Sequence, residues 1–267
     1  MVLGAIALNV FRESVRDRVF YNLLLFGVLL VGASVLVGQM TAGQDVKIIK
    51  DLGLAATSLF GLFIAVFVGI GLVWKEVERR SVYSLIAKPV RRPELVLGKY
   101  LGLAFTLLVN VSVMAVVLYL LLGYMQWASP ENLRAAWEAP ATDPALLKAL
   151  LLIYVQLLLV TAIALFFSTF SSPMLSAALT FGFYVIGHFN ADLEHFDAVV
   201  TSTPIVWLLR ALYYLLPNLA PFDITAKVVH GQAVTPGYLL MTIGYAVVYI
   251  AFLLAAGSYI FARRDLK

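Results

Sequence analysis

Long apolar stretches alternate with short polar ones along the whole 267-residue chain. Six of the apolar stretches reach the length of roughly 20 residues that an α-helix needs to cross a bilayer. The pattern therefore predicts an all-α integral membrane protein, with 1–267 forming one transmembrane domain. The six predicted spans cover 20–38, 53–74, 99–123, 147–167, 173–189 and 236–261.

Two parts of this assignment depend on local signals. The apolar stretch 144–189 is too long for one crossing, and the polar segment 168–173, which ends in a proline, divides it into two spans. The stretch 204–216 is too short to cross and carries Arg210. We therefore expect a re-entrant or interfacial segment there, inside an outer loop over 190–235 and before the last span.

The segment 1–19 precedes the first span and has the pattern of an amphipathic helix. Its apolar and charged side chains fall on opposite faces: Leu8, Phe11, Val15 and Val19 on one, and Arg12, Glu13, Arg16 and Asp17 on the other. This pattern predicts an elbow helix that lies along the membrane surface. A solvated helical lead-in is the alternative, because the charged face alone does not require lipid.

The most charged part of the chain is the loop 75–98, between the second and third spans. Its first half has the pattern of a short amphipathic helix, with Trp74, Val77, Ser81 and Leu85 on one face. Prolines at 89 and 93 end that helix and turn the chain towards the next span. A charged, structured loop between two spans indicates a docking surface for a partner in the cytosol.

Composition and charge agree with a membrane protein and orient it. Hydrophobic residues make up 62% of the chain and charged residues 13%, which leaves too little polar material for a separate soluble domain. Thirteen of the 19 Lys and Arg residues lie in 1–19, 75–99 and 262–267. This bias places both termini in the cytosol. Because the basic residues flank spans, the net charge of +4 suits anionic lipid headgroups and not nucleic acid.

Several chemistries are disfavoured by what the sequence lacks. The chain has no cysteine and no phosphate-binding loop, since the Gly98–Lys99 pair is followed by Tyr100 and has no upstream glycine. The spans carry almost no ionisable side chains, which argues against an ion-coupled carrier and against an intramembrane enzyme. We therefore expect no catalytic residues, no cofactor-binding residues and no ATP site in this chain.

One segment has the composition of a metal site. His188, Asp192 and His195 would share a helical face at spacings of four and three. The zinc-helix pattern H-E-x-x-H is absent, and no second cluster complements this one. We therefore favour a polar cap at the outer end of the fifth span and expect no metal.

A stripe of small residues marks the second span. Gly53, Thr57, Gly61, Ala65 and Gly69 recur every four residues, which predicts a face where another helix approaches closely. The partner helix belongs either to the same chain or to a second copy. A shorter pair of the same kind, Gly98 and Gly102, begins the third span.

Together these features resemble the ABC-2-type permease subunits of ATP-binding-cassette exporters. The loop is similar to the family pattern E-x-x-x-x-S-x-x-x-L-x-x-x-P-x-x-R-x-x-x-x-x-x-K, at Glu76, Ser81, Leu85, Pro89, Arg92 and Lys99. The elbow helix and the six spans extend the resemblance over the whole chain. The segments 168–173 and 216–223 are similar to a branch that includes the NosY-like permeases.

The resemblance implies a cytosolic coupling helix that docks on a separate ATPase, which binds ATP and Mg²⁺. The docking residues implied are Glu76, Glu78, Arg79, Arg80, Tyr83, Leu85, Ile86, Lys88, Pro89, Arg91 and Arg92. It also implies two ATPase copies and a permease dimer, either a homodimer or a pair with a similar permease. The setting implied is the cytoplasmic (inner) membrane of a bacterium or archaeon.

Two functions remain open at this point. The first is a permease subunit that exports an unidentified substrate with energy from the partner ATPase. The second is a non-transport membrane subunit that transmits the conformational change of the ATPase to an extracytoplasmic partner. The longest predicted outer loop has only 46 residues, which favours the first.

Overall fold

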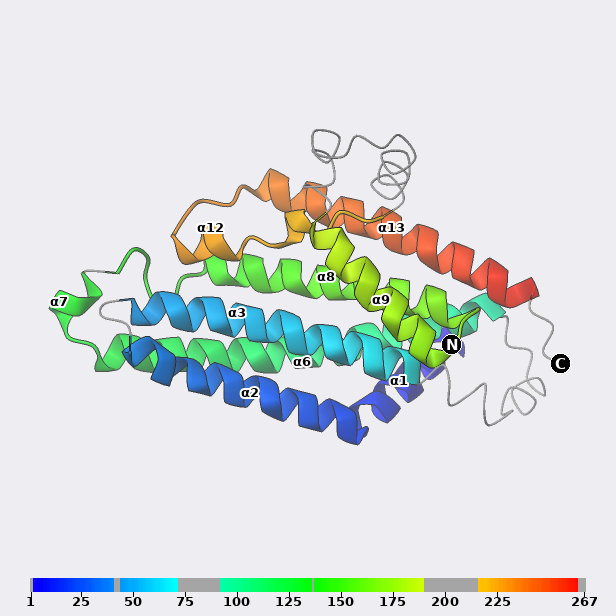
Figure 1. Cartoon of the computed structure of the whole chain (residues 1–267), viewed down its shortest axis with the longest axis horizontal. Helices are drawn as coiled ribbons and strands as arrows, with labels where there is room; N and C mark the ends of the chain where they lie inside the picture. The colour runs from blue at the N-terminus through cyan, green and yellow to red at the C-terminus, as the bar shows by residue number, and fades with distance from the viewer. Residues whose placement is uncertain (1, 41–43, 72–91, 136, 190–215, 264–267) are drawn as a thin grey trace, which may run out of the picture.

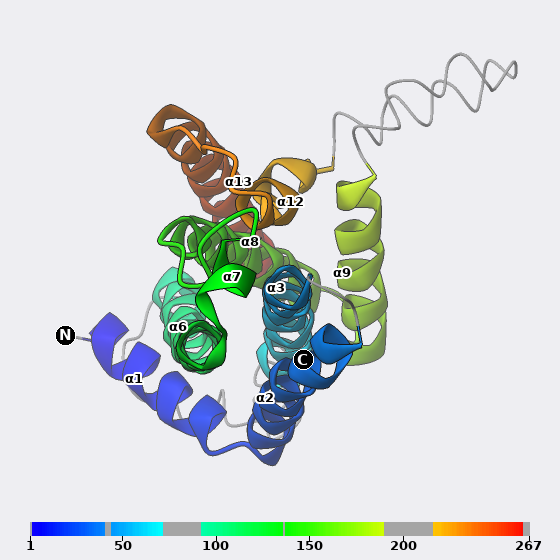
Figure 2. The same cartoon turned by 90° about the vertical axis from the view of Figure 1, so that its left-hand side faces the viewer.

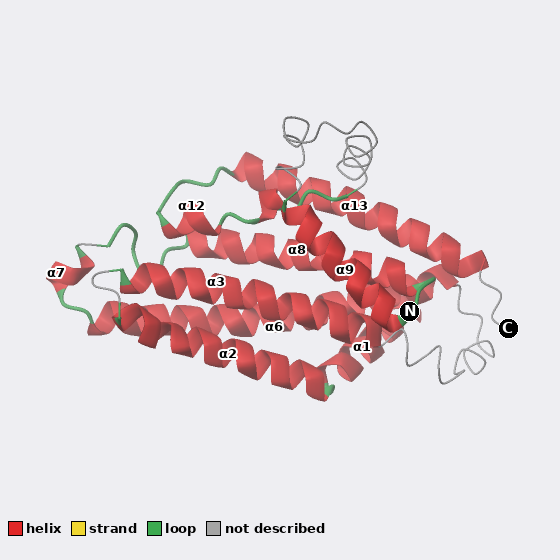
Figure 3. Cartoon of the chain, viewed as in Figure 1, coloured by secondary structure: helices red, strands yellow, loops and turns green. Residues whose placement is uncertain are grey.

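The computed structural model describes residues 2–40, 44–71, 92–135, 137–189 and 216–263, and within them it contains helices and no strands (Figure 3). The long helices are α1 (Val2–Val15), α2 (Arg18–Gln39), α3 (Asp45–Phe63), α6 (Arg92–Ala128), α8 (Ala145–Ser168), α9 (Pro173–His188) and α13 (Pro236–Arg263). The short elements are the π-helix η1 (Ile64–Val68), α7 (Glu131–Arg134), the 3₁₀-helix η3 (Ala220–Phe222) and α12 (Thr225–Val229).

The helices form an elongated bundle (Figure 1). Helices α2, α3, α6, α8 and α13 run along its length, and α1 crosses one end, beside the start of α6. In the end view, α3, α6 and α8 are central, α2 and α13 lie on opposite sides, and α1 and α9 are outermost (Figure 2). We call the end that holds α1 and the last turn of α13 the α1 end, and the opposite end, with α7, the α7 end.

Five helices in the described residues are long and apolar enough to cross a membrane: α2, α3 with its continuation to Gly71, α6, α8 and α13. The helix at the predicted fifth span, α9, has only 16 residues. At 1.5 Å per residue it is roughly 24 Å long, less than the hydrocarbon core of about 30 Å. It starts at the α1 end and stops part-way along the bundle (Figure 1). The six-span count therefore stays a prediction.

The polar segment 168–173 does separate two helices. Helix α8 ends at Ser168 and α9 begins at Pro173. The last carbonyl groups of α8 receive hydrogen bonds from side-chain hydroxyls in place of the helical N–H groups that would follow. Ser168, Thr169 and Ser171 donate to the backbone oxygens of Leu165, Phe166 and Phe167 at 2.7, 2.7 and 2.9 Å. Pro173 occupies the first turn of α9, where no backbone N–H donor is needed.

Two helices extend beyond their predicted limits. Helix α3 begins at Asp45 and not at 53, and α6 begins at Arg92 and not at 99. In α3 the added turns are held by the tertiary structure, since Ile49 is buried and Lys50 Nζ donates to the backbone oxygen of Pro140 at 2.7 Å. Lys50, whose charge indicates a loop in the sequence, thus lies inside a helix.

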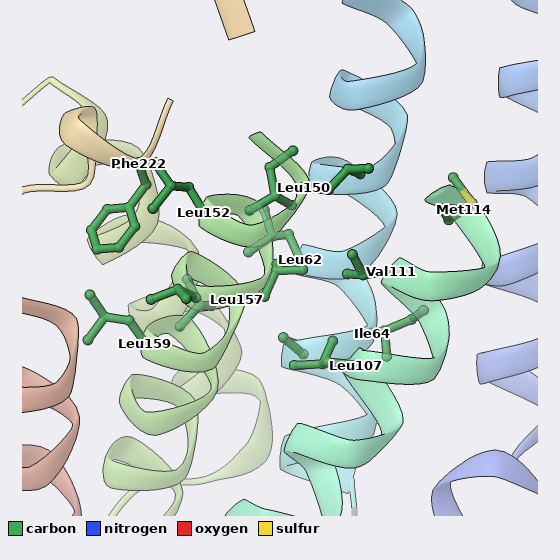
Figure 4. Close-up of a cluster of buried hydrophobic side chains, with 14 of the residues drawn as sticks. Leu62, Ile64, Leu107, Val111, Met114, Leu150, Leu152, Leu157, Leu159 and Phe222 are labelled. Atoms are coloured by element: carbon green, nitrogen blue, oxygen red, sulfur yellow. The ribbon is translucent and has the colours of Figure 1, made fainter. Parts of the chain in front are cut away.

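The hydrophobic core is centred on α8. Most of its side chains are buried, from Leu146 near its start to Phe167 near its end. Its neighbours in the core are α3 and η1 on one side, with Leu62 and Ile64, and the segment around η3 on the other, with Phe222 (Figure 4). Helix α6 adds a further layer with Leu107, Val111 and Met114 beside α3.

Candidate functional site

The predicted docking loop lies almost wholly outside the described residues. Of its predicted contacts, Glu76, Glu78, Arg79, Arg80, Tyr83, Leu85, Ile86, Lys88, Pro89 and Arg91 are not described, and Arg92 is the first residue of α6. What the structure does place are the two helices that flank the loop. One is α3, which continues through η1 to Gly71, and the other is α6.

Helix α1 is packed against the beginning of α6 through two glycines. A Cβ atom on Gly98 would lie 2.6 Å from Ile6 Cγ2. A Cβ atom on Gly102 would lie 2.6 Å from Val10 Cβ and 2.7 Å from the backbone oxygen of Ala7. Such distances are too short for contact between non-bonded atoms, so only glycine permits this approach. The contact joins the first helix of the chain to the helix that follows the predicted docking loop.

Helix α1 buries its small residues against the bundle and leaves part of the predicted apolar face exposed. Ala7, Val10 and Ser14 are buried against the bundle, whereas Leu8 is 48% exposed. Val19 belongs to the next helix, because α1 ends at Val15 and Asp17 caps α2 by accepting a hydrogen bond from the Val19 N–H at 2.9 Å. A helix is present where the periodicity predicts one, and its small residues are the ones that approach α6. Its predicted position along the membrane surface stays a prediction.

The small-residue stripe of α3 lies against two other helices of the same chain. A Cβ atom on Gly53 would clash with the side chain of Leu118 in α6, and one on Gly61 would clash with Leu157 in α8. Thr57 and Ala65 are buried, and Gly69 lies within ordinary contact distance of the Leu103 side chain in α6. At the C-terminal part of the stripe, α3 changes into η1. Single π-turns of this kind occur frequently at functional sites.

Polar contacts at the α7 end join segments that are far apart in the sequence. His230 Nδ1 donates to Glu138 Oε2 at 2.7 Å, and Lys47 Nζ lies 3.9 Å from Glu138 Oε1. Lys148 Nζ donates to the backbone oxygen of Val234 at 2.9 Å. This network connects three parts of the chain: α3, the α7–α8 connection with the start of α8, and the segment after α12. Sequence reasoning missed it, because no local pattern links positions about 90 residues apart.

The Glu138 contact predicts a pH dependence at the α7 end. The hydrogen bond from His230, aided by Lys47, holds the pKa of Glu138 below its ordinary value of about 4.5. A carboxyl whose pKa is lower in the folded state stabilises the fold above that ordinary value, and this stabilisation is lost as pH falls through the folded-state pKa. We therefore expect Glu138→Gln to lower the thermal midpoint slightly at pH 7 and to have a progressively smaller effect as pH falls below about 4.5.

Thermal unfolding of the purified wild type and of Glu138→Gln at several pH values measures this difference. The effect is small because the side chains are exposed to solvent. Glu131→Gln in the neighbouring α7 is the control, since Glu131 is exposed and should show no such difference. An equal effect of Glu138→Gln at pH 7 and pH 3 would contradict the assignment.

The predicted metal candidate is described only at His188. Its Nε2 lies 2.9 Å from Gln156 Nε2 of α8, and its Nδ1 lies 2.9 Å from the backbone oxygen of Tyr184. His188 thus joins α9 to α8, while Asp192 and His195 lie outside the described residues. No group of three potential metal ligands occurs in the part of the chain that the structure covers.

The side chain of Asn110 is buried inside the bundle without a hydrogen-bond partner among the described residues. Asn110, in the middle of α6, is fully buried, and neither atom of its amide forms a hydrogen bond with the described residues. An unpaired amide in an apolar interior costs free energy, so it marks a locally unfavourable point in the packing of α6.

Comparison with known proteins identifies the family. The family model described as ABC-2 family transporter protein matches residues 4–266, which is nearly the whole chain. No curated protein matches the sequence. The family match and the five long apolar helices agree on a multi-pass membrane protein. The chain belongs to the ABC-2 family of transporter proteins, whose members are membrane permease subunits without a nucleotide-binding domain of their own.

Proposed function

We propose that the chain is the permease subunit of an ABC exporter that moves an unidentified substrate across the cytoplasmic membrane of a bacterium or archaeon. The family match over 4–266 is the observation that carries this proposal. ATP and Mg²⁺ are bound by a separate ATPase, because this sequence contains no phosphate-binding loop. The working assembly contains two ATPase copies and two permease copies, most simply as a permease homodimer.

The ATPase docks on the coupling helix within 75–98, with Arg79, Arg80 and Tyr83 as principal contacts. The packing of the flanking helices supports this proposal. Movement of the loop pulls directly on α6, which is one continuous helix from Arg92 to Ala128, and on α3. Because α1 is packed on the first turns of α6, it moves with them as one body. Rigid-body shifts of packed helices are a common means of passing a conformational change through a protein.

Co-purification with the partner ATPase tests the docking surface. We expect Arg79→Glu together with Arg80→Glu to abolish ATPase binding, since two attractive charges become repulsive. Arg263→Glu together with Arg264→Glu is the matched control, because it makes the same charge change on the same predicted side of the membrane. Retained binding in the first variant would show that the contacts are wrong. Failure of the wild type to bind any ATPase would contradict the function itself.

Export is tested with the reconstituted complex of permease and ATPase. We expect one class of substrate, among lipids, glycans, peptides, drugs and ions, to stimulate ATP hydrolysis and to cross the membrane. Hydrolysis that responds only to an extracytoplasmic protein would favour a non-transport subunit instead.

A further inference from the structure

The junction between α1 and α2 contains an open hollow of about 730 Å³. The described residues that line it are polar or charged: Asn9, Arg12, Glu13, Arg16, Asp17 and Arg18. Residues 9, 12 and 16 recur at spacings of three and four, so they lie on one side of α1, facing away from the buried residues Ala7, Val10 and Ser14. The packing of α1 on α6 thus fixes the arginine-bearing side of α1 towards the hollow.

The three arginines of the hollow outnumber the two carboxylates beside them. None of Arg12, Arg16 and Arg18 forms an ion pair with a carboxylate within the described residues. One oxygen of Asp17 accepts the hydrogen bond that caps α2. Counting all five charged side chains of the lining, the hollow has a net charge of +1. This excess matches a phosphodiester, which carries one negative charge, and guanidinium groups bind phosphate oxygens in bidentate geometry.

An exposed apolar strip leads away from the hollow along α2. Arg18, Tyr21, Leu25 and Leu29 follow one another at spacings of three and four, so they share a face of the helix. Tyr21, Leu25 and Leu29 are 53%, 56% and 56% exposed. A charged hollow at the start of a membrane-spanning helix, continued by an apolar strip, has the layout of a phospholipid with its headgroup and acyl chain.

We propose that this hollow binds an anionic phospholipid of the cytosolic leaflet. The arginines hold the phosphodiester, and one acyl chain lies along the strip on α2. The proposal rests on the membrane orientation given under the proposed function. A soluble phosphate compound would match the arginines but would leave the strip without a role. The lipid bridges α1 and α2, and so it stabilises the junction at the end of α1, the helix that packs on Gly98 and Gly102 of α6.

Lipid retention by the isolated permease tests this proposal without the ATPase. The full chain is incorporated into bilayer discs with equal amounts of phosphatidylglycerol and phosphatidylethanolamine, then transferred to detergent, and the retained lipid is measured by mass spectrometry. We expect about a fivefold or greater enrichment of phosphatidylglycerol, because each basic residue near a membrane surface contributes roughly that factor. Arg12→Gln, Arg16→Gln and Arg18→Gln combined should abolish the enrichment.

The matched control removes three positive charges from the same predicted side, through Arg263→Gln, Arg264→Gln and Lys267→Gln, and should keep the enrichment. Glu13→Gln, which removes a negative charge from the hollow, should increase it. Enrichment that survives in the triple arginine variant, or that is lost equally in the control, would overturn the proposal. So would displacement of the lipid by soluble glycerophosphate, or preference for phosphatidylethanolamine. If the triple arginine variant lost ATPase binding but kept the phosphatidylglycerol enrichment, the hollow would be a contact for the ATPase, and the lipid site would be rejected.

The lipid result and the docking result are separable. Arg79→Glu with Arg80→Glu should leave lipid enrichment unchanged, and the triple arginine variant should still bind the ATPase. Loss of lipid enrichment in the wild type, with ATPase binding intact, would reject the lipid site and leave the proposed function standing.

Discussion

Replacing Gly102 by Leu is expected to detach α1 from α6 and to destabilise the protein by about 3 kcal/mol, the upper end of the usual range for overpacking. The reason is that Gly102 is opposed by the backbone oxygen of Ala7 as well as by Val10 Cβ. A side chain can rotate away from a new neighbour, but backbone atoms move only if the whole helix moves. We therefore expect α1 to separate from α6 and not to adjust in place.

Two measurements check this expectation. Thermal unfolding of the purified permease gives the loss of stability. Spin labels at Leu8→Cys and Leu108→Cys, both exposed positions, report the distance between α1 and α6, and the absence of native cysteine makes the labelling specific. The distance distribution should be narrow in the unmodified background and broad with Gly102→Leu.

The control is Gly4→Ala, in α1 itself. A Cβ atom there would meet nothing within 4 Å, so the substitution should be neutral or stabilise the helix by up to about 1 kcal/mol. If Gly102→Leu left the distance distribution unchanged, α1 would not be held by this contact. Its proposed movement with α6 would then have no structural basis.

The second large effect is expected at Gly61, where α3 meets α8. Gly61→Val should destabilise the protein by about 2 kcal/mol, because the new side chain meets Leu157, which is fully buried and has little room to move. Unlike Gly102, Gly61 is opposed by the end of a side chain. The clash should therefore be relieved by shortening that side chain.

A double-mutant cycle tests this difference. Leu157→Ala alone should cost about 2 to 5 kcal/mol through the cavity that it leaves. The double variant should be more stable than the sum of the two single effects predicts, since the valine fills part of the cavity. Strict additivity would contradict direct packing of α3 on α8 at this point. Gly244→Ala in α13 is the control, because a Cβ atom there meets nothing within 4 Å.

The two glycine contacts also show how far sequence reasoning reaches. The spacing of Gly53, Gly61 and Gly69 identifies a surface for close packing, because only small residues let two helices approach each other. It leaves open whether the partner is in the same chain. In the structure, Leu118 and Leu157 of the same chain lie against Gly53 and Gly61. In the sequence, nothing distinguishes Leu118 and Leu157 from the other apolar residues of α6 and α8.

By itself the sequence determined the helical, membrane-embedded character of the chain, the break after Ser168 and the lack of a phosphate-binding loop. These properties are local, since they depend on apolar length, on proline and hydroxyl groups, and on a contiguous motif. Only the tertiary structure decided that α1 packs on Gly98 and Gly102 of α6, that α3 begins at Asp45, and that α9 has 16 residues. The reason is physical: a helix face or a helix end becomes stable only when another segment covers its apolar atoms and pairs its polar ones, as Pro140 does for Lys50 across 90 residues.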